Sequence, residues 1–321
     1  MTMDKIVINM DGCSKCGKCV SICPNNALEF IEGYPELVHS ELCTECGICE
    51  DQCPTGAIRL SEGAMGEISK ENIRGDEKYV KAAEDITTLI GMEKPPIGVT
   101  MVKPGQSVPG GFALLGSPTR HCVSIHMASL GAALYVPAEQ HACAAAKAAL
   151  GISELPEKVR SGKIPYMHGL ASSEQAAARI MAEVPRLPVG SAVGTLVAPL
   201  SSFSVAPDVI ILVTKPKQAM WVANALLFEN GSPRITANFA GMQASCADVT
   251  AVPMKTQEVN FSLGCYGCRS AGKLSDEEMY VGIPVDKLDA VVKGLKGLRR
   301  AMGKLDDAGQ REEESKKGCG A

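Results

Sequence analysis

Two runs of cysteine near the start of the chain have the spacing needed to hold iron. Each run is Cys-x2-Cys-x2-Cys-x3-Cys-Pro. The cysteines are Cys13, Cys16, Cys19 and Cys23 in the first run and Cys43, Cys46, Cys49 and Cys53 in the second. A [4Fe–4S] cube takes one thiolate at each iron, and three cysteines three positions apart let one tight loop reach three corners. The two runs therefore predict two such clusters.

The fourth ligand of each cluster must come from elsewhere, and in this pattern the cysteine before proline binds the cluster of the other run. The expected ligand sets are Cys13, Cys16, Cys19 with Cys53, and Cys43, Cys46, Cys49 with Cys23. Zinc or disulfides are the alternative. Zinc sites, however, use four ligands in two pairs rather than evenly spaced triplets followed by a Cys-Pro.

With both runs complete, residues 1–60 resemble the two-cluster bacterial-type ferredoxins. The resemblance implies a pseudo-twofold fold of short hairpins and helical turns around two cubes. Residues 6–8 and 57–60 are predicted strands, and residues 28–30 and 37–38 a hairpin across Gly33-Tyr34-Pro35. A segment of this size buries only about 60 % of its unfolded surface, so the clusters should supply much of its interior.

Two stretches of the remaining chain concentrate reactive side chains. Leu263-Gly264-Cys265-Tyr266-Gly267-Cys268-Arg269 places a Cys-x2-Cys just beyond a predicted strand, where Arg269 could hold an anion or stabilise a thiolate. Arg120-His121-Cys122 opens a predicted helix, whose N-terminus lowers a thiol pKa and attracts anions. The other candidates are Cys143, Cys246, His126, His141 and His168.

Three hypotheses compete for these cysteines. The first is a third iron–sulfur centre, held by Cys265, Cys268 and two or three of Cys122, Cys143 and Cys246. The second is a thiol/disulfide pair of Cys265 and Cys268 that the clusters reduce. The third is packing, because cysteine is among the most buried residues. His141, on an Ala-rich predicted helix, and His168, beside Gly169, favour structural roles.

Residues 76–304 resemble the uncharacterised family numbered 169 among the domains of unknown function. The motifs that carry the resemblance are Pro96-Ile97-Gly98-Val99, Arg120-His121-Cys122, Ala198-Pro199-Leu200, Pro207-Asp208-Val209-Ile210, Pro216-x-Gln218-Ala219-Met220, Gly264-Cys265-x-Gly267-Cys268-Arg269 and Glu278-Met279 with Ile283-Pro284. The resemblance implies an anaerobic bacterial or archaeal setting. It supplies a domain boundary rather than a reaction.

Composition and charge narrow the class of protein. The 321 residues are 45 % hydrophobic and 21 % charged, as in ordinary globular proteins. No run of 18 apolar residues predicts a membrane span, and fourteen cysteines without a signal-peptide pattern favour a reducing cytoplasm. Residues 1–60 hold four Lys/Arg and nine Asp/Glu, which suits a basic redox partner protein. The near-neutral remainder and the lack of a Walker loop argue against nucleic-acid and nucleotide binding.

The predicted fold class is α+β, with a ferredoxin-like N-terminal module and a mixed α/β C-terminal domain. The predicted parts are a two-cluster domain at 1–60, a linker at 61–75, the mixed domain at 76–304 and a disordered tail at 305–321. The helices expected in the C-terminal domain are 76–90, 120–134, 138–150, 172–183, 216–228 and 284–302. The expected strands are 97–102, 192–200, 209–214, 234–240 and 258–263, with loops at 103–117 and 161–169.

These observations predict a cytoplasmic iron–sulfur protein that passes electrons between a soluble donor and a redox centre or substrate in residues 76–304. A reductase or electron-transferring subunit is one form of this hypothesis. A non-catalytic redox sensor or docking protein, and an accessory factor in cluster or cofactor maturation, are the alternatives. Lys215-Pro216-Lys217-Gln218 places two cations at a helix start, where a small anionic substrate could bind, although a solvated helix end accounts for it as well.

Overall fold

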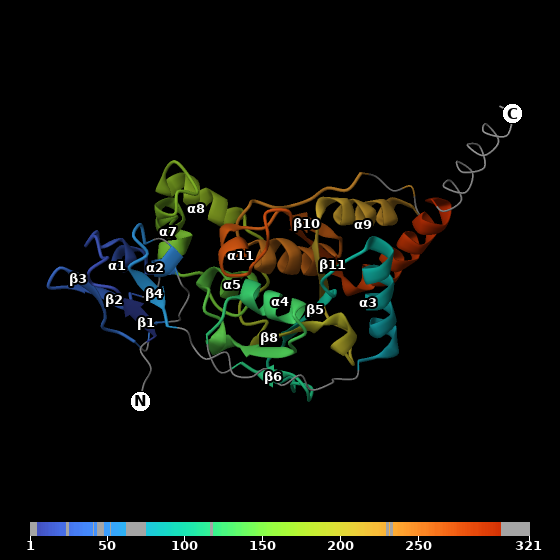
Figure 1. Cartoon of the computed structure of the whole chain (residues 1–321), viewed down its shortest axis with the longest axis horizontal. Coiled ribbons are helices and arrows are strands. Elements are labelled where there is room, and N and C mark those ends of the chain that lie inside the picture. The colour runs from blue at the N-terminus through green and yellow to red at the C-terminus, as the bar shows by residue number, and fades with distance from the viewer. Residues whose placement is uncertain are drawn as a thin grey trace, which may run out of the picture.

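The computed structural model describes residues 5–23, 26–40, 42–43, 48–51, 53–61, 75–115, 118–228, 231 and 234–302. Cys46, most of the predicted linker at 61–75 and the predicted tail at 305–321 lie outside the described residues. The N-terminal module sits at one end of the molecule, beside α7 and α8 of the C-terminal domain (Figure 1). Among the described residues, no helix has both the length and the apolar character that crossing a membrane requires.

Four short strands frame the N-terminal module. β1 (Ile6–Ile8) pairs antiparallel with β4 (Ile58–Leu60), and β2 (Leu28–Ile31) pairs antiparallel with β3 (Tyr34–Leu37). α1 (Lys18–Ile22) and α2 (Ile48–Asp51) each begin one residue before the third cysteine of their run and contain it. The hairpin turn lies at Glu32-Gly33, both with positive φ, so the predicted turn across Gly33-Tyr34-Pro35 was one position late. Tyr34 and Pro35 belong to the second strand.

A seven-stranded sheet forms the centre of the C-terminal domain, in the order β10-β11-β9-β5-β8-β7-β6. Neighbouring strands are antiparallel except β6 and β7. The strands are β5 (Ile97–Val102), β6 (Ala113–Leu114), β7 (Leu134–Pro137), β8 (Gly194–Pro199), β9 (Val209–Thr214), β10 (Asn260–Ser262) and β11 (Met279–Pro284). Helix and strand are thus mixed, as the α+β prediction has it.

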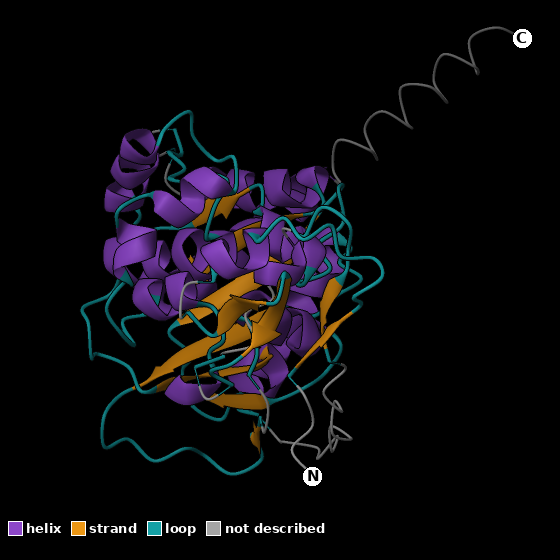
Figure 2. Cartoon of the chain, turned by 90° about the vertical axis from the view of Figure 1, so that its left-hand side faces the viewer, coloured by secondary structure: helices purple, strands orange, loops and turns teal. Residues whose placement is uncertain are grey.

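Both faces of this sheet are covered, so the domain has three layers. Alternate residues of β9 enter different cores: Val209, Ile211 and Val213 face one apolar cluster, and Ile210 and Leu212 face the other. Side chains of a strand alternate between the two faces, which explains this division. Figure 2 shows the strands crossing the body of the domain with helices packed against them.

One helical layer contains α3 (Glu77–Ile90), α9 (Pro216–Phe228) and the helix at 288–302. The opposite layer contains α4 (His121–Ser129), α5 (Ala144–Ala149), α6 (Glu157–Arg160), α7 (Lys163–Met167), α8 (Glu174–Glu183) and a π-helix at Ala244–Ala251. The remaining helices are α10 (Val252–Thr256) and α11 (Tyr266–Ser270). The cysteines of the C-terminal domain all lie on this second side.

Several predicted helices are wrong in extent. The helix expected at 120–134 ends at Ser129, because residues 134–137 form β7 at the sheet. The helix expected at 138–150 begins only at Ala144, and His141 precedes it in extended conformation. Pro284 ends β11 instead of opening the last helix. At Leu134–Pro137 and at Pro284, pairing with a distant strand overrides local helix propensity. Ahead of α5, Ala138–Gln140 form a 3-10 turn and His141 makes an isolated bridge with Thr119.

The predicted strand at 234–240 and the two predicted loops were also wrong. Residues 234–240 form no strand, and residues 244–251 that follow are a fully buried π-helix. The loop expected at 103–117 contains β6, and the loop expected at 161–169 contains α7. The strands expected at 97–102 and 209–214 and the helix at 216–228 match the observed elements end to end.

Candidate functional site

Four cysteines of the N-terminal module face one cavity. Cys13, Cys16 and Cys19 from the first run and Cys53 from the second line it together. Three thiols from one loop and a fourth from the other run form a donor set of the kind a [4Fe–4S] cube takes. The residues present therefore fit the group. Of the other expected set, Cys23, Cys43 and Cys49 are described and Cys46 is not.

The cysteines before proline are hydrogen-bonded as thiolates are. The amide of Ala27 donates to Cys23 Sγ and the amide of Ala57 donates to Cys53 Sγ, each at 3.3 Å. Burial raises the pKa of Cys53, but donors at Ile58, Thr55 and Ala57 outweigh it and lower the value to about 7. N–H groups that face a sulfur stabilise its negative charge. The sulfurs of Cys23 and Cys53 therefore each face an amide N–H that can stabilise negative charge.

The five cysteines of the C-terminal domain come together from four separate segments. Cys122 is in the first turn of α4, Cys143 immediately precedes α5, and Cys246 is within the π-helix. Cys265 immediately precedes α11, and Cys268 lies within it. Cys122, Cys143, Cys246 and Cys265 line one cavity of about 330 Å³, and Cys268 lies fully buried behind Cys265. The sequence named all five, and the third-centre hypothesis grouped them in one site; that they bind such a centre stays a prediction.

The thiols of this site differ in what they contact. Cys265 Sγ and Cys268 Sγ are 3.3 Å apart. Cys122 Sγ donates to Gly267 O at 3.5 Å, and Cys246 Sγ donates to Gln243 O at 3.4 Å. Among the described residues, no group of three His, Cys, Asp or Glu side chains is arranged to hold a single metal ion.

Hydrogen bonds between thiols and burial raise the pKa of three cysteines of this site. The hydrogen bond with Cys122 and then burial raise the pKa of Cys268 to about 11, against the lowering effect of Cys265. The hydrogen bond with Cys268, followed by burial, raises the pKa of Cys265. Desolvation raises the pKa of Cys246 well above its usual range. These three thiols are therefore neutral at neutral pH.

Two histidines are buried beside the cavity and are neutral. Burial lowers the pKa of His121 to about 4 and that of His141 to about 3. His121 Nε2 lies 3.4 Å from Thr250 Oγ1, and His141 Nε2 lies 3.2 Å from Thr195 Oγ1. Their rings are 6.3 Å apart. The structural role predicted for His141 stays a prediction, whereas His121 and His168 both line the cavity.

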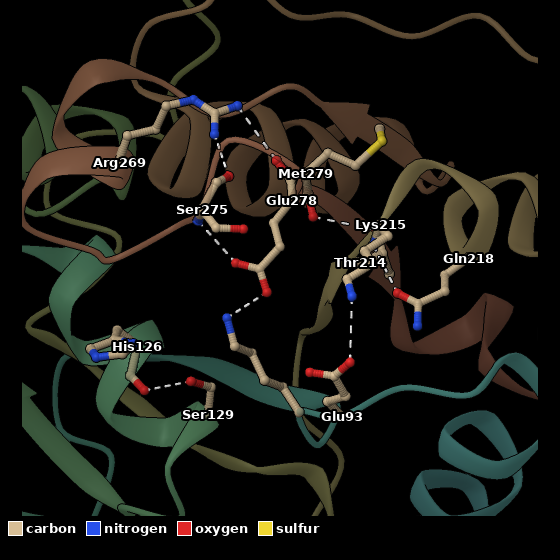
Figure 3. Close-up of polar contacts among 11 residues, drawn as sticks. Glu93, His126, Ser129, Thr214, Lys215, Gln218, Arg269, Ser275, Glu278 and Met279 are labelled. Atoms are coloured by element: carbon tan, nitrogen blue, oxygen red, sulfur yellow. Dashed lines mark hydrogen bonds and ion pairs between the residues drawn. The ribbon is translucent and has the colours of Figure 1, made fainter.

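Arg269 closes the Cys-x2-Cys loop through backbone contacts. Its guanidinium donates to the carbonyls of Leu263, Ser275 and Glu278, so it faces carbonyl oxygens (Figure 3). The Glu278 carboxylate accepts from the Ser275 amide at 3.0 Å and from Lys94 Nζ at 2.5 Å. This network ties both ends of the segment around α11 to β11. Arg269 thereby positions the two cysteines.

Lys215 and Gln218, in the cationic turn, already make hydrogen bonds and an ion pair within the chain. The Lys215 amide donates to Gln218 Oε1 at 2.7 Å, and Lys215 Nζ lies 3.4 Å from a Glu93 carboxylate oxygen (Figure 3). Gln218 Nε2 donates to Gly91 O at 2.6 Å. These contacts fit a capped helix start with a surface ion pair, and they lie away from the residues that line the cysteine cavity.

The N-terminal module contacts the wall of the cavity. Ile22, next to Cys23, is fully buried in the same apolar cluster as Val159 and Ile164, and these two also line the cavity. Lys158 Nζ donates to Cys23 O at 3.5 Å and to Asn26 Oδ1. One short segment, α6–α7, therefore has the first cysteine run on one side and the five-cysteine site on the other.

Sequence reasoning did not single out the residues that complete the cavity. Gln243, with a positive φ of 54°, begins the π-helix, and its Oε1 is buried without a hydrogen-bond partner. Tyr266 and Leu170 line the cavity and are exposed. A π-helix is a frequent feature of functional sites, but its wider turn has no sequence period that could have revealed it.

Comparison with known proteins identifies both parts of the chain. A model of the family DUF169, described as uncharacterised ArCR, matches residues 85–294. A model described as a 4Fe-4S dicluster domain matches residues 12–57. The chain is also 30 % identical over 220 residues to the uncharacterized protein MJ0308 of Methanocaldococcus jannaschii, covering 68 % of this chain and 94 % of that protein. No solved structure matches the chain.

Proposed function

Because this chain belongs to the DUF169 family and carries a 4Fe-4S ferredoxin-type domain, we propose that it transfers electrons between a soluble redox partner and its five-cysteine cavity. The ferredoxin-type domain supports iron–sulfur electron transfer as such. The proposal adds two clusters in that domain and an acceptor site in residues 76–304. Residues 61–75 are proposed as the linker between the two parts.

The proposed ligand sets are Cys13, Cys16, Cys19 with Cys53, and Cys43, Cys46, Cys49 with Cys23. When bound, the clusters supply reversible one-electron transfer. The chain's own residues provide the surroundings. The amides of Ala27 and Ala57 donate hydrogen bonds to the sulfurs of Cys23 and Cys53 and stabilise negative charge there. Ile6, Leu28 and Ile58 form a small buried core against the cysteines.

The observation that carries the proposal is the position of the cavity. Four cysteines from distant segments line it and a fifth, Cys268, is buried next to Cys265; the α6–α7 segment that forms part of its wall also contacts Cys23 through Lys158. At this junction Ile22 is fully buried in the same apolar cluster as Val159 and Ile164. This arrangement supports transfer between the module and the cavity over a short path through protein.

The negative charge of the N-terminal module indicates that its electron donor is a basic protein. Residues 1–60 carry four Lys/Arg against nine Asp/Glu, whereas the rest of the chain carries 28 against 27. A basic electron-carrier protein would be steered to the module, and its association would weaken as ionic strength rises. Cys16 is exposed and Cys13 half-exposed, so the first run offers a side that a donor can approach.

The test is iron and sulfide analysis with EPR on the anaerobically purified full chain. Two clusters predict about eight iron and about eight sulfide per chain, and Cys13→Ser and Cys43→Ser should each remove one reduced-cluster EPR signal. Zinc in place of iron would overturn the two-cluster assignment. Loss of the same EPR signal in both variants would also overturn it, because each variant should remove a different signal. Iron that moves to an acceptor apoprotein would indicate an accessory role instead.

A further inference from the structure

The pair Cys265–Cys268 stands apart from the other thiols of the cavity. Its sulfurs are 3.3 Å apart, and both residues lie in one loop and the short helix that follows it. Cys265 is half-buried and lines the cavity, whereas Cys268 is fully buried behind it. An accessible sulfur with a buried partner is the arrangement that thiol–disulfide exchange needs, one thiol to attack and one to resolve.

Hydrogen-bond direction separates this site from the cluster ligands of the same chain. Cys23 and Cys53 accept amide N–H bonds, as anionic sulfur does. Cys122 and Cys246 instead donate to the carbonyl oxygens of Gly267 and Gln243. A thiolate at either position would face a carbonyl oxygen and be repelled by it. The sulfurs of Cys122 and Cys246 thus have carbonyl neighbours, unlike the sulfurs of Cys23 and Cys53.

The spacing of the pair leads to the same conclusion. Tetrahedral sites with metal–sulfur bonds of about 2.3 Å separate their sulfurs by about 3.8 Å. The Cys265–Cys268 separation is 3.3 Å, closer than such a pair of ligands. The pair needs only a small closing movement to reach the S–S bond length of about 2.05 Å.

Cys265 is the one sulfur of the pair that lines the cavity. Its hydrogen bond with Cys268 and its burial raise its pKa, and the backbone amides of Ala244 and Cys268 act in the opposite direction. Ala244 is the first residue of the buried π-helix. Attack by Cys265 therefore requires that its proton be removed first.

We propose that Cys265 and Cys268 form a redox-active dithiol/disulfide pair, which is the terminal acceptor of the electron transfer proposed above. Reduction of the pair breaks one S–S bond and takes up two electrons, supplied one at a time by the N-terminal module, and two protons from solvent. The site that accepts electrons is thus a two-electron site. This inference rests on the proposed function only for the source of the electrons.

The oxidant that the cavity would accept is a small organic disulfide. Cys265 thiolate attacks one sulfur of that disulfide, which releases the first thiol and leaves a mixed disulfide. Cys268 then attacks Cys265 Sγ, forming the internal disulfide and releasing the second thiol. The cavity of about 330 Å³ is large enough for such a molecule, and its exposed rim at Tyr266 and Leu170 is apolar. Buried Gln243 Oε1, without a partner, can accept a hydrogen bond from it.

The first experiment equilibrates the anaerobic full chain in buffers of oxidised and reduced dithiothreitol, followed by acid quenching, alkylation and mass spectrometry. Trypsin leaves Cys265 and Cys268 in one peptide, residues 256–269, so an internal disulfide appears as loss of both alkylation sites. We expect the disulfide in the wild type and in Cys143→Ser, and its absence in Cys265→Ser and Cys268→Ser. Failure to form it at any buffer ratio would overturn the pair.

Iron analysis of the same variants provides a second way to refute the pair. Cys265→Ser and Cys268→Ser should retain the full iron content of the wild type. Loss of about four iron atoms in either variant, with the two ferredoxin-type signals intact, would mean that these cysteines hold a third cluster. This outcome would overturn the dithiol assignment and leave electron transfer to the cavity standing.

The second experiment tests the source of the electrons. The oxidised chain is mixed with reduced methyl viologen, and the return of alkylatable Cys265 and Cys268 is followed in time. Wild type should reduce the pair at least tenfold faster than Cys49→Ser, which lacks one cluster ligand. Equal rates would overturn the proposed electron route while leaving the dithiol pair in place.

Discussion

The same residue type is used in two different ways in this chain, and the local hydrogen bonds decide which. Cys23 and Cys53 accept amide N–H bonds at 3.3 Å, whereas Cys122 and Cys246 donate to carbonyl oxygens. Amide donors favour thiolate and carbonyl neighbours favour thiol, because each stabilises one protonation state of sulfur. Cysteine count and spacing cannot distinguish the two cases when the neighbours come from distant segments.

Buried titratable groups give a prediction at the residue scale. Burial lowers the pKa of His141 from 6.5 to about 3 and raises that of Asp248 from 3.8 to about 6. Between pH 6.5 and 3 the unfolded chain binds more protons at His141, so this residue lowers stability as pH falls. Asp248 acts in the opposite sense, because the folded chain binds its proton first between pH 6 and 3.8.

The two variants should therefore change the acid response in opposite directions. At 1.36 kcal/mol per pKa unit, the full effect is roughly 5 kcal/mol for His141 and about 3 kcal/mol for Asp248. Urea unfolding of His141→Asn and Asp248→Asn between pH 7 and 4 measures it. The first variant should lose stability less steeply than wild type on acidification and the second more steeply. Parallel curves for all three proteins would contradict the assigned burial effects.

At the scale of elements, the Cys-x2-Cys segment depends on Gly264, in the loop before α11, rather than on Gly267, within α11. Gly264 has a φ of +88°, and a Cβ there would lie 2.5 Å from Leu274 Cδ2, whereas Gly267 has open space at that position. Gly264→Ala should destabilise the chain by about 1–3 kcal/mol, since both the backbone and a buried neighbour are strained. Gly267→Ala should change stability by less than about 0.5 kcal/mol. Thermal unfolding compares the two, and equal losses would refute the role of Gly264.

Elements with strong local signals could be predicted, and those made by distant pairing could not. α3 is capped by Asp76, whose side chain accepts from the Lys78 amide, and it ends at Gly91 with a φ of 67°. Both features are visible in sequence. β7 was not predicted, because Leu134–Pro137 gains its strand conformation from pairing with β8. The π-helix has no sequence period of its own, so no element was predicted for the segment that carries Cys246.

At the scale of the whole molecule, the sequence predicted the two domains but not how their segments meet in space. The cysteine runs indicated the first ligand set, and Cys13, Cys16, Cys19 and Cys53 do line one cavity. The five-cysteine site requires α4, α5, the π-helix and α11 to meet on one side of the sheet. These four elements meet because of the order of the strands in the sheet. Local sequence patterns do not specify that order. The contact between module and cavity wall depends on Lys158 and Ile22, which no motif marks.

Lys158 allows the junction between module and cavity to be tested. It donates to Cys23 O and Asn26 Oδ1, while Lys163, on the following helix, is exposed. A half-buried charged hydrogen bond of this kind contributes about 1 kcal/mol, so Lys158→Ala should raise local opening roughly fivefold. Hydrogen exchange at the Ala27 amide measures the opening, and methyl viologen reduction of the oxidised Cys265–Cys268 pair measures its consequence. Both should change in Lys158→Ala and neither in Lys163→Ala. If exchange rises but reduction keeps its rate, the junction holds the module in place without forming the route to the cavity.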